Sequence, residues 1–322
     1  MKALVIYNPM AGAAGQGSLQ EALRVFTERG WDLTAKETGA PRDATRFARE
    51  AATANFDAVI AVGGDGTMNE AVNGLIGSRT ALGVLPLGTV NVWAREMGLP
   101  INDLPAAAQR LVDADIRTID VGQVSARHAP EPRAFVLWCG VGFDALIIKL
   151  IEPQRAAKRR FGMLLFWLVG LREAWSYRGR RTLLEIDGQH SRHRAILTLI
   201  SNCQLYGGVV RIATDATLDD GRLDVVMFKG SGLLHTAWHL IKVFLGWHRR
   251  DPETETCQGR LVRVRARRVP VHADGELVGT TPAEITVIPQ ALRVLVPTTV
   301  NRGLFRRALE RSSREEEKWS LQ

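Results

Sequence analysis

The segment Gly63-Gly64-Asp65-Gly66-Thr67 combines the residue types that phosphate binding requires. Glycines let the backbone approach a phosphate closely, and the N–H groups at the start of a helix favour negative charge. The segment has neither the Gly-Lys-Ser/Thr of a Walker loop nor the pattern Gly-x-Gly-x-x-Gly. Its position between an apolar run and a helical stripe predicts a nucleotide phosphate site, with a plain glycine turn as the alternative.

Asp65 within this segment is a candidate partner for a catalytic Mg²⁺, directly or through a water molecule. Mg²⁺ retains several waters and uses few carboxylates. The alternative role for Asp65 is to form the turn. Two further acidic segments, Asp219-Asp220-Gly221 and Asp274-Gly275-Glu276, also have the residue types of turns, because Asp-Gly between alternating segments is a common hairpin signal.

The N-terminal part of the chain must hold the glycine segment at the end of a strand. Short apolar runs predict buried strands there, and helical stripes separate them. The strands are expected at Ala3–Tyr7, Leu33–Lys36, Ala58–Val62 and Leu82–Leu85. Thr67 and Glu70 have the spacing of a capping box at the start of the following helix. Strands that alternate with helices in this way indicate a parallel sheet in an α/β domain.

The chain after about Asp120 has a different pattern. Alternating segments dominate and indicate a mostly antiparallel β domain. They are expected at Ala134–Val141, Arg181–Ile186, Ala195–Ser201, Leu223–Phe228, Leu261–Arg267, Ile285–Ile288 and Leu292–Val296. Two apolar helical stretches, Phe161–Tyr177 and Leu233–Trp247, interrupt them. We therefore expect two domains, residues 1–120 and 121–297.

The composition indicates in which environment the protein works and which kinds of partner it favours. The 322 residues carry a formal net charge of +8 with a pI near 9.8, which favours anionic partners such as nucleic acid, anionic lipid or nucleotide phosphate. The longest apolar run, Phe161 to Leu171, has about half the roughly 20 residues that a spanning helix needs. Three scattered cysteines fit a reducing compartment. We expect a soluble or peripheral cytoplasmic protein.

An ordered set of motifs resembles the diacylglycerol-kinase-type lipid kinases, a superfamily that also includes sphingosine, ceramide and NAD kinases. The glycine segment continues to Asn69 and Glu70, as in the nucleotide loop of that family. The other matching segments are Asn8-Pro9, Pro86-Leu87-Gly88-Thr89-Val90-Asn91-x-x-Ala94, Asp219-Asp220-Gly221-Arg222-Leu223-Asp224 and Asp274-Gly275-Glu276. Together they span nearly the whole chain in order, which makes the set far more specific than any one motif.

The resemblance implies a Rossmann-like α/β nucleotide domain of the NAD kinase and diacylglycerol kinase type, followed by a β-sandwich-like domain, with the active site between them. It also implies that the tail, residues 298–322, returns to pack on the first domain. ATP would be the phosphate donor and Mg²⁺ the metal. The residues expected at the nucleotide are Thr38, Gly63, Gly64, Asp65, Gly66, Thr67, Met68, Asn69, Thr89 and Asn91. Helix capping before Trp93 is the alternative role for Thr89 and Asn91.

The resemblance places the proton acceptor in the segment Asp274-Gly275-Glu276, because a lipid hydroxyl needs a carboxylate within hydrogen-bond reach. We expect Glu276 to be the general base and Asp274 to support Mg²⁺ or orient the site, with the reverse assignment and a simple turn as alternatives. The resemblance also implies a structural Mg²⁺ on Asp220 and the carbonyl oxygens of Thr217 and Arg222, which are ligands that hard cations accept. A turn without metal is the alternative there.

One departure from the family pattern concerns the metal: Val92 stands where the family has an Asp that joins the Mg²⁺–water network. The leading interpretation is a lipid kinase acting on a diacylglycerol-like hydroxyl. A soluble kinase of the NAD-kinase type and a weakly catalytic lipid-binding relative are the alternatives. A lipid enzyme needs an apolar acyl slot, whereas a dinucleotide enzyme needs a polar one. Nucleic-acid binding explains only the charge, since no motif for it accompanies the basic residues.

Two segments have the composition that suits an anionic membrane surface, namely basic residues beside an apolar, tryptophan-bearing helix. Covering the core of the β domain is the alternative for both. The first has Arg155, Lys158, Arg159 and Arg160 before an apolar stretch that includes Trp167. The second has Trp238, Phe244 and Trp247 before His248-Arg249-Arg250. We expect peripheral contact with the inner membrane surface. The sequence leaves the oligomeric state open, a homodimer included.

Overall fold

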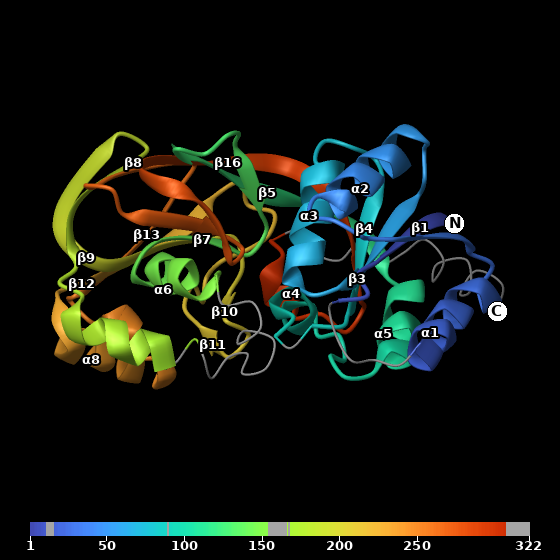
Figure 1. The fold of residues 1–322 in the computed structure, drawn as a ribbon, viewed down its shortest axis with the longest axis horizontal. Helices are drawn as coiled ribbons and strands as arrows, with labels where there is room; N and C mark the ends of the chain where they lie inside the picture. The colour runs from blue at the N-terminus through green and yellow to red at the C-terminus, as the bar shows by residue number, and fades with distance from the viewer. Residues whose placement is uncertain (11–15, 89, 154–165, 167, 307–322) are drawn as a thin grey trace, which may run out of the picture.

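The chain folds into two lobes that lie side by side (Figure 1). The computed structural model describes residues 1–10, 16–88, 90–153, 166 and 168–306. The lobe on the right of Figure 1 holds the N-terminal strands and helices, and the lobe on the left is built mainly of strands. An α/β domain followed by a strand-rich domain is the succession that the sequence predicts.

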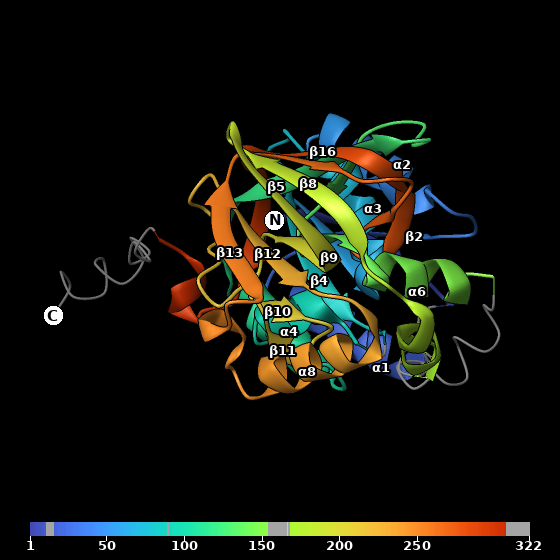
Figure 2. The same cartoon turned by 90° about the vertical axis from the view of Figure 1, so that its left-hand side faces the viewer.

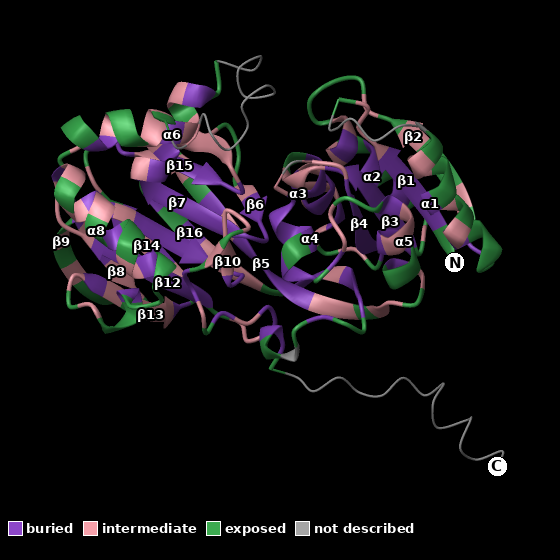
Figure 3. Ribbon diagram, turned by 90° about the horizontal axis from the view of Figure 1, so that it is seen from below, coloured by how far each residue is buried: buried purple, intermediate pink, exposed green. Residues whose placement is uncertain are grey.

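A parallel sheet organises the N-terminal lobe. Its strands are β2 (Asp32–Glu37), β1 (Lys2–Tyr7), β3 (Ala58–Gly63) and β4 (Ala81–Pro86), in that spatial order. Every residue of β3 and β4 is buried (Figure 3), as expected for parallel strands covered on both faces. The helices of this lobe are α1 (Gln16–Glu28), α2 (Asp43–Thr53), α3 (Asp65–Leu75), α4 (Val92–Glu96) and α5 (Leu104–Val112). The prediction of a parallel sheet from these four strands is confirmed.

Small residues let α2 and α3 pack closely together. The buried residues of α2 have the spacing of one helical face. They are Ala44, Phe47, Ala48 and Ala51. On α3, a Cβ added to Gly74 would lie 2.5 Å from the Thr45 carbonyl oxygen and 2.8 Å from Ala48 Cβ. This tight contact fixes the direction of α3, whose N-terminus carries the glycine segment.

The strands of the C-terminal lobe pair antiparallel, as the sequence predicts. They are β5 (Asp115–Arg127), β6 (Arg133–Phe135), β7 (Trp138–Gly142), β8 (Arg180–Ile186), β9 (Gln189–Ser201), β10 (Leu205–Tyr206), β11 (Val210–Arg211), β12 (Leu223–Lys229), β13 (Thr254–Gly259), β14 (Leu261–Arg265), β15 (Pro270–Ala273) and β16 (Glu276–Val296). Helices α6 (Phe143–Ile151) and α8 (Gly232–Phe244) lie against them, and short 3₁₀ turns occur at His248–Arg250 and Arg302–Leu304.

One strand, β16, connects the two lobes. It pairs antiparallel with β5 and touches β4 at Val294 opposite Leu82, so the strands form one continuous 14-stranded sheet. The sequence predicted two strands here, Ile285–Ile288 and Leu292–Val296. The structure has a single strand whose register shifts between Ile288 and Leu292. The proposed boundary between residues 120 and 121 falls within β5, the partner of β16.

The described part of the C-terminal tail returns to the body of the protein. Val300, Leu304 and Phe305 are buried in the core cluster that also contains the parallel strands. The N–H of Leu218 donates to the Leu304 carbonyl oxygen at 2.8 Å, and the guanidinium carbon of Arg117 lies 5.0 Å from the centre of the Phe305 ring. Residues 307–322 lie outside the described part of the chain.

Candidate active site

The glycine segment lies at the carboxyl end of β3, where the chain enters α3. Strand β3 ends at Gly63, and α3 begins at Asp65 with Gly64 as its N-cap. The N–H of Met68 donates to the Gly64 carbonyl oxygen at 3.1 Å and starts the helical hydrogen bonds. The N–H groups of the preceding turn have no acceptor within the helix, which is the arrangement that binds phosphate at a helix N-terminus.

The capping box predicted at Thr67 and Glu70 is wrong, because α3 begins before Thr67. Instead, Thr67 Oγ1 accepts a hydrogen bond from Asn8 Nδ2 at 3.1 Å, which ties the end of β1 to the loop after β3. The Glu70 carboxylate accepts a hydrogen bond from the N–H of Ala44, at 3.2 Å, near the start of α2. The two side chains therefore join neighbouring elements instead of capping their own helix.

The loop that follows β4 packs against the glycine segment. A Cβ on Gly88 would lie 2.9 Å from Gly64 Cα, and a Cβ on Gly63 would lie 2.5 Å from Thr67 Oγ1. A side chain at Gly88 would push the two loops apart, and one at Gly63 would displace Thr67. The glycines are therefore needed for the packing of the loops as well as for access to a ligand. Thr89, expected at the nucleotide, lies outside the described residues.

Asp65 caps the short helix α4 from the neighbouring loop. Its carboxylate accepts hydrogen bonds from the N–H groups of Val92, at 3.0 Å, and Trp93, at 3.3 Å. Burial raises the pKa of Asp65, and these two donors act in the opposite direction. The contact from Val92 uses the backbone N–H, so the replacement of the family's Asp by Val at this position leaves it intact.

Asn91 stabilises its own loop. It has a left-handed backbone conformation, with φ of 47°, and precedes α4 without a side-chain cap hydrogen bond. Its side chain bonds the backbone of Gly88 instead: Oδ1 accepts from the Gly88 N–H at 3.1 Å, and Nδ2 donates to the Gly88 carbonyl oxygen. Helix capping by the Asn91 side chain, the alternative role expected from the sequence, is therefore wrong, and Asp65 supplies the cap.

Asp274 is a buried anchor between the two lobes. Its carboxylate accepts hydrogen bonds from Asn69 Nδ2 of α3, at 2.9 Å, and from three consecutive backbone N–H groups, each at 3.0 Å. These belong to Val136, Leu137 and Trp138. Burial raises the pKa of Asp274 to about 6, although the four donors favour its ionised form. The Asp274 carboxylate therefore holds in place the turn that begins at Asp274.

Glu276 follows in the same turn and faces the glycine segment. Its Oε1 lies 3.6 Å from the position that a Cβ on Gly66 would take. Its Oε2 forms an ion pair of 2.6 Å with Arg133, and the Glu276 side chain is 43% exposed. The carboxylate of Glu276 therefore lies at the N-terminus of α3 and is accessible, whereas that of Asp274 is buried.

The other residues expected at the nucleotide differ in their accessibility. Thr38 is half-buried at the carboxyl end of β2, where its N–H donates to the Tyr7 carbonyl oxygen at 2.9 Å. Met68 and Asn69 are buried in α3. Asn69 Nδ2 donates to the Ala134 carbonyl oxygen, at 2.9 Å, in addition to its bond with Asp274. The side chains of Met68 and Asn69 are therefore surrounded by protein.

A cavity of about 900 Å³ adjoins the Arg133–Glu276 ion pair, between α2 and β6. Four guanidinium groups line it. They belong to Arg42, Arg46, Arg49 and Arg133. The carboxylates of Glu50 and Glu131 also line it, so the arginines outnumber the acids. The Nε of Arg133 is buried and has no hydrogen-bond partner among the described residues. Arg42, Arg46 and Arg133 are already in ion pairs with carboxylates, so the feature of the lining that favours a ligand with acceptor atoms is the buried Nε of Arg133.

A buried pair, Asp144 and His272, supports the turn that carries Glu276 and was not predicted. His272 Nε2 lies 2.8 Å from Asp144 Oδ2, and His272 Nδ1 accepts a hydrogen bond from the Gly275 N–H at 3.3 Å. Both side chains are almost fully buried. A Cβ on Gly140 would clash with both. The partners are 128 positions apart, so no spacing in the sequence marks them.

The segment expected to bind a structural metal forms a turn before β12. Asp220 Oδ1 accepts a hydrogen bond from the Arg222 N–H at 2.9 Å, which is a turn contact. Thr217 Oγ1 is buried and has no hydrogen-bond partner in the described part of the chain. The carboxylate and hydroxyl oxygens supply the donor chemistry that Mg²⁺ prefers.

Two buried carboxylates outside the recognised motifs also link segments that are distant in the sequence. Asp120 accepts hydrogen bonds from the N–H groups of Gly221, at 2.5 Å, and Gln290, at 2.8 Å. Glu96 of α4 accepts from two consecutive N–H groups around the start of β10, at 3.0 and 2.9 Å. Burial raises the pKa of Glu96. Neither residue lies in a spacing pattern, so their roles follow only from the structure.

Comparisons with known proteins are consistent along the whole chain. Residues 2–124 match the diacylglycerol kinase catalytic domain, and residues 138–296 match the YegS C-terminal NAD kinase beta sandwich-like domain. A diacylglycerol kinase from Bacillus subtilis (strain 168) is 31% identical over 300 residues, covering 92% of this chain and 96% of that protein. A diacylglycerol kinase from Mycobacterium tuberculosis (strain ATCC 25618 / H37Rv) is 32% identical over 301 residues, with coverages of 92% and 95%.

The fold is also found in a solved structure. The crystal structure of a diacylglycerol kinase from Bacillus anthracis str. Sterne has a TM-score of 0.75 to this chain at 24% identity, covering 93% of this chain and 98% of that one. The expected architecture, an α/β nucleotide domain followed by a β-sandwich-like domain, is therefore confirmed. With the two domain matches and the full-length relatives, the chain belongs to the diacylglycerol kinase family and is a kinase.

Proposed function

We propose that the protein transfers the γ-phosphate of ATP to the hydroxyl group of a diacylglycerol-like lipid, at a site between the two lobes. The observation that carries this proposal is the position of Glu276, an accessible carboxylate of the β domain that lies beside Gly66 at the start of α3. One lobe offers a proton acceptor, and the other offers N–H groups for phosphate. Phosphoryl transfer depends on holding these two functions close together.

The start of α3 and the loop after β4 form the phosphate side of the proposed site. Backbone N–H groups of residues 63–67 bind the ATP phosphates, aided by the positive end of the α3 dipole. Thr38 and Thr89 are the hydroxyl-bearing residues that we propose to contact the nucleotide directly. Asn91 and Asn69 act through the loops and the turn that their side chains hold in place.

The arginine-lined cavity is our candidate for the remainder of the nucleotide. Its volume of about 900 Å³ is within the usual range of small-molecule sites, and it adjoins Glu276 through Arg133. The partnerless Nε of Arg133 supports this assignment, because a nucleotide oxygen would satisfy a buried donor. Guanidinium groups stack on flat aromatic rings, and Arg42 offers such a group for the base of the nucleotide.

Glu276 removes the proton as the lipid hydroxyl oxygen attacks the γ-phosphorus. A bond forms between this oxygen and the phosphorus, the bond from the phosphorus to the bridging oxygen of ATP breaks, and ADP leaves. The proton remains on Glu276 at the end of the step. The ion pair with Arg133 orients the Glu276 carboxylate toward the site before the lipid arrives.

Asp274 supports the base in this proposal. Four donors already use its acceptor capacity, and it is buried, so it is poorly placed to take a proton from a substrate. Its contact with Asn69 ties the turn to α3, which keeps Glu276 beside the phosphate loop. We therefore keep Glu276 as the general base and Asp274 as a residue that positions it.

The residues near the phosphate loop fit a Mg²⁺ ion held through water. When bound, Mg²⁺ neutralises phosphate charge and orients the γ-phosphate. Both carboxylate oxygens of Asp65 accept N–H groups, yet each oxygen retains acceptor capacity for a water ligand. Because Val92 has no carboxylate, Asp65 is the acid of these two loops that remains for the metal. We propose the second Mg²⁺ at Asp220 with the carbonyl oxygens of Thr217 and Arg222, and the unsatisfied Thr217 hydroxyl supports a polar ligand there.

We further propose that the protein acts from the cytoplasmic side, by peripheral contact with an anionic membrane and without a nucleic-acid partner. Within the described ranges, no helix has the length and apolar character to cross a membrane. The basic residues and tryptophan expected to approach the membrane lie outside the described residues. They are Arg155, Lys158, Arg159, Arg160 and Trp167. A homodimer remains a prediction.

A phosphorylation screen tests the proposal. Purified protein is mixed with labelled ATP, Mg²⁺ and mixed micelles that contain diacylglycerol, phosphatidylglycerol, a sphingoid base or a monoacyl lipid, and separately with NAD. We expect a labelled lipid and unlabelled NAD, because an acyl-bearing alcohol is the acceptor we propose. Phosphorylation of NAD without turnover of any lipid would overturn the assignment.

A further inference from the structure

Helix α8 turns polar residues inward and apolar residues outward. Its buried residues are Gly232, Thr236, His239 and Val243. Its exposed large apolar residues, with those that follow it, are Leu234, Trp238, Leu240, Ile241, Phe244, Leu245 and Trp247. Leu234 is 82% exposed and Trp247 is 58% exposed. A helix that only covers a core shows the reverse pattern, so these apolar side chains need another explanation.

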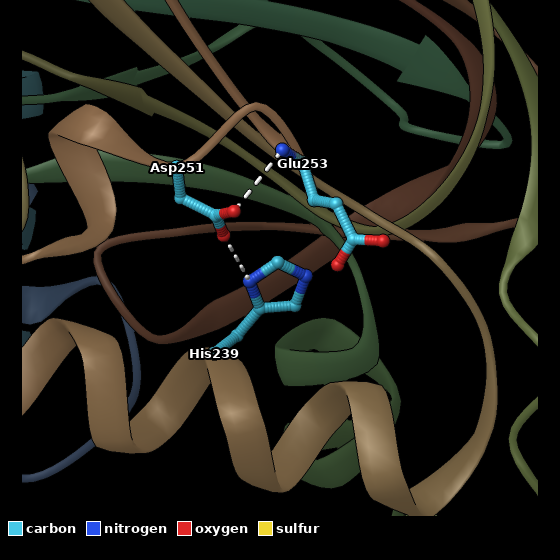
Figure 4. Close-up of side chains that lie close together, drawn as sticks. All are labelled: His239, Asp251 and Glu253. Carbon is cyan, nitrogen blue, oxygen red and sulfur yellow. Dashed lines mark hydrogen bonds and ion pairs between the residues drawn. The ribbon is translucent and has the colours of Figure 1, made fainter.

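Polar contacts anchor the inward face of α8 (Figure 4). His239 Nε2 lies 2.7 Å from the Lys229 carbonyl oxygen, and the Asp251 carboxylate lies 2.6 Å from Lys242 Nζ. Figure 4 shows the Asp251 carboxylate beside His239 Nδ1, at 3.6 Å. With Glu253, His239 and Asp251 also form a group close enough to share a metal ion. The Lys242 ammonium already neutralises Asp251, so we interpret the group as the anchor of α8.

A second apolar row lies next to α8. Residues 168–176 are helical, and Leu168, Leu171 and Trp175 are 58%, 66% and 75% exposed at the spacing of one helical face. The N–H of Gly232 donates to the Tyr177 carbonyl oxygen at 2.9 Å, so the end of this helix meets the start of α8. Figures 1 and 2 show both helices together at the base of the C-terminal lobe. The two helices therefore adjoin, and each carries an exposed apolar row.

The charges around this surface suit an anionic partner. Three acidic side chains there are held in ion pairs with Lys or Arg of the same region, and Glu253, 45% exposed, lies 3.7 Å from His235 Nε2. The pairs are Glu173 with Arg172, Asp215 with Arg249 and Asp251 with Lys242. Arg178 and Arg250 are exposed in addition. An acid in an ion pair repels an anionic membrane only weakly. Each additional cation near such a membrane surface favours binding.

We propose that α8 and residues 168–176 form the surface by which the protein docks on a bilayer that contains anionic lipid; this rests on the proposed lipid substrate. A bilayer accepts a protruding row of apolar side chains without a matching groove, and the acyl chains of the substrate lie in it. Three exposed indoles, those of Trp175, Trp238 and Trp247, belong to this surface. Indole side chains favour the interface between membrane and water.

The test combines Leu234→Ser, Trp238→Ser and Ile241→Ser in one variant, because these residues lie on one face of α8. Sedimentation with vesicles of phosphatidylglycerol and phosphatidylcholine gives the partition coefficient without any turnover. We expect at least ~10-fold weaker binding than the parent, since three apolar side chains lose their burial in lipid. Turnover of long-chain diacylglycerol in these vesicles should fall, while that of a dispersed short-chain diacylglycerol should not.

Ile116→Ser is the matched control, because Ile116 is 38% exposed on β5 and Ile241 is 46% exposed on α8. The control should bind vesicles like the parent. Parent-like vesicle binding by the triple variant overturns the inference, and so does an equal loss of turnover on both substrates. A change from dimer to monomer with unaltered vesicle binding would assign the surface to a second copy of the chain.

The binding measurement separates this inference from the proposed function. If the parent binds vesicles through α8 but phosphorylates no lipid, the proposed lipid kinase activity fails and the docking surface stands. If the parent phosphorylates dispersed lipid but the triple variant binds vesicles as the parent does, the proposed docking surface is wrong and the proposed activity stands. Circular dichroism and ATP binding verify that the triple variant is folded.

Discussion

Helices α3 and α8 both bury polar side chains, and the burial serves different purposes. In α3, Thr67 bonds to Asn8, which follows β1, and Asn69 bonds to Asp274 of the other lobe, so its polar residues join segments around the candidate site. In α8, His239 Nε2 lies within hydrogen-bond distance of the Lys229 carbonyl oxygen and Thr236 bonds to the Gly232 carbonyl oxygen of its own helix, while the large apolar residues remain outside.

The difference shows that the position of hydrogen-bond partners influences which face of a helix is buried. An unpaired buried polar group costs about 1–3 kcal/mol, which favours burial of the polar side chains that have hydrogen-bond partners inside. For α3 the partners belong to distant strands, and the apolar residues Val72 and Leu75 pack inward as well. For α8 the partners are carbonyl oxygens close in the sequence, those of Gly232 and Lys229, and the large apolar residues of the helix are left exposed.

The largest effect is expected from one substitution placed in both helices. Leu75→Ala in α3 should lower the free energy of unfolding by about 2–5 kcal/mol, because Leu75 is fully buried and a cavity would remain. Leu234→Ala in α8 should change it by no more than about 0.5 kcal/mol, since this side chain is already exposed. Urea unfolding measures both, and equal losses would contradict the outward orientation of α8.

Replacing the proposed base should affect catalysis and spare stability. Glu276→Gln should lower kcat by at least ~10²-fold, equivalent to about 2.7 kcal/mol, because the amide cannot accept the proton. Glu284→Gln is the control, as Glu284 is a half-exposed carboxylate of the same strand that pairs with Arg263. Steady-state kinetics should show a parent-like control, and a parent-like Glu276→Gln enzyme would show that the base lies elsewhere.

Removing a polar contact should lower the free energy of unfolding more in α3 than in α8. Asn69→Ala removes one of the four donors to the buried Asp274 carboxylate and leaves the Ala134 carbonyl with only the 3.2 Å contact from Asn73 Nδ2. We therefore expect a loss of about 1–3 kcal/mol in unfolding free energy and a lower kcat. Thr236→Ala removes a hydroxyl that bonds only to the Gly232 carbonyl of its own helix, and we expect a smaller loss. A larger loss at Thr236 than at Asn69 would reverse the comparison.

The smallest effect concerns pH. Burial raises the pKa of Asp274 from 3.8 to about 6, so between these two pH values the folded protein binds a proton there that the unfolded chain does not. The protonated group would direct an O–H at its N–H donors, which should loosen the turn and lower kcat as the pH falls through about 6. The stability contribution has the opposite sign: between these two values, the free energy of unfolding from this group decreases as the pH rises.

A pH–rate profile of the parent and of Asp274→Asn tests this. The parent should lose activity on the acid side near pH 6. The variant should be slower at all pH values and should lack that step, because it has no carboxyl group to titrate at this position. An identical acid limb in both proteins would assign the titration to another group.

Local patterns were predicted well from the sequence, and side-chain partners were predicted poorly. The four parallel strands and the α8 helix follow from the periodicity of apolar residues, which is a property of neighbouring positions. The capping box at Thr67 and Glu70 failed because both side chains bond to other elements. The Asp144–His272 pair was missed because its members meet only after β7, α6 and β15 have packed together.

The sequence by itself determined the family, the order of the two domains and the glycine segment at the start of a helix, because each depends on residue types at short spacings. Only the tertiary structure decided that Asp274 is buried while Glu276 is accessible, and that α8 exposes Leu234 and its neighbours. Accessibility depends on which distant segments cover a side chain: α3 and residues 136–138 cover Asp274, whereas no described segment covers the outer face of α8.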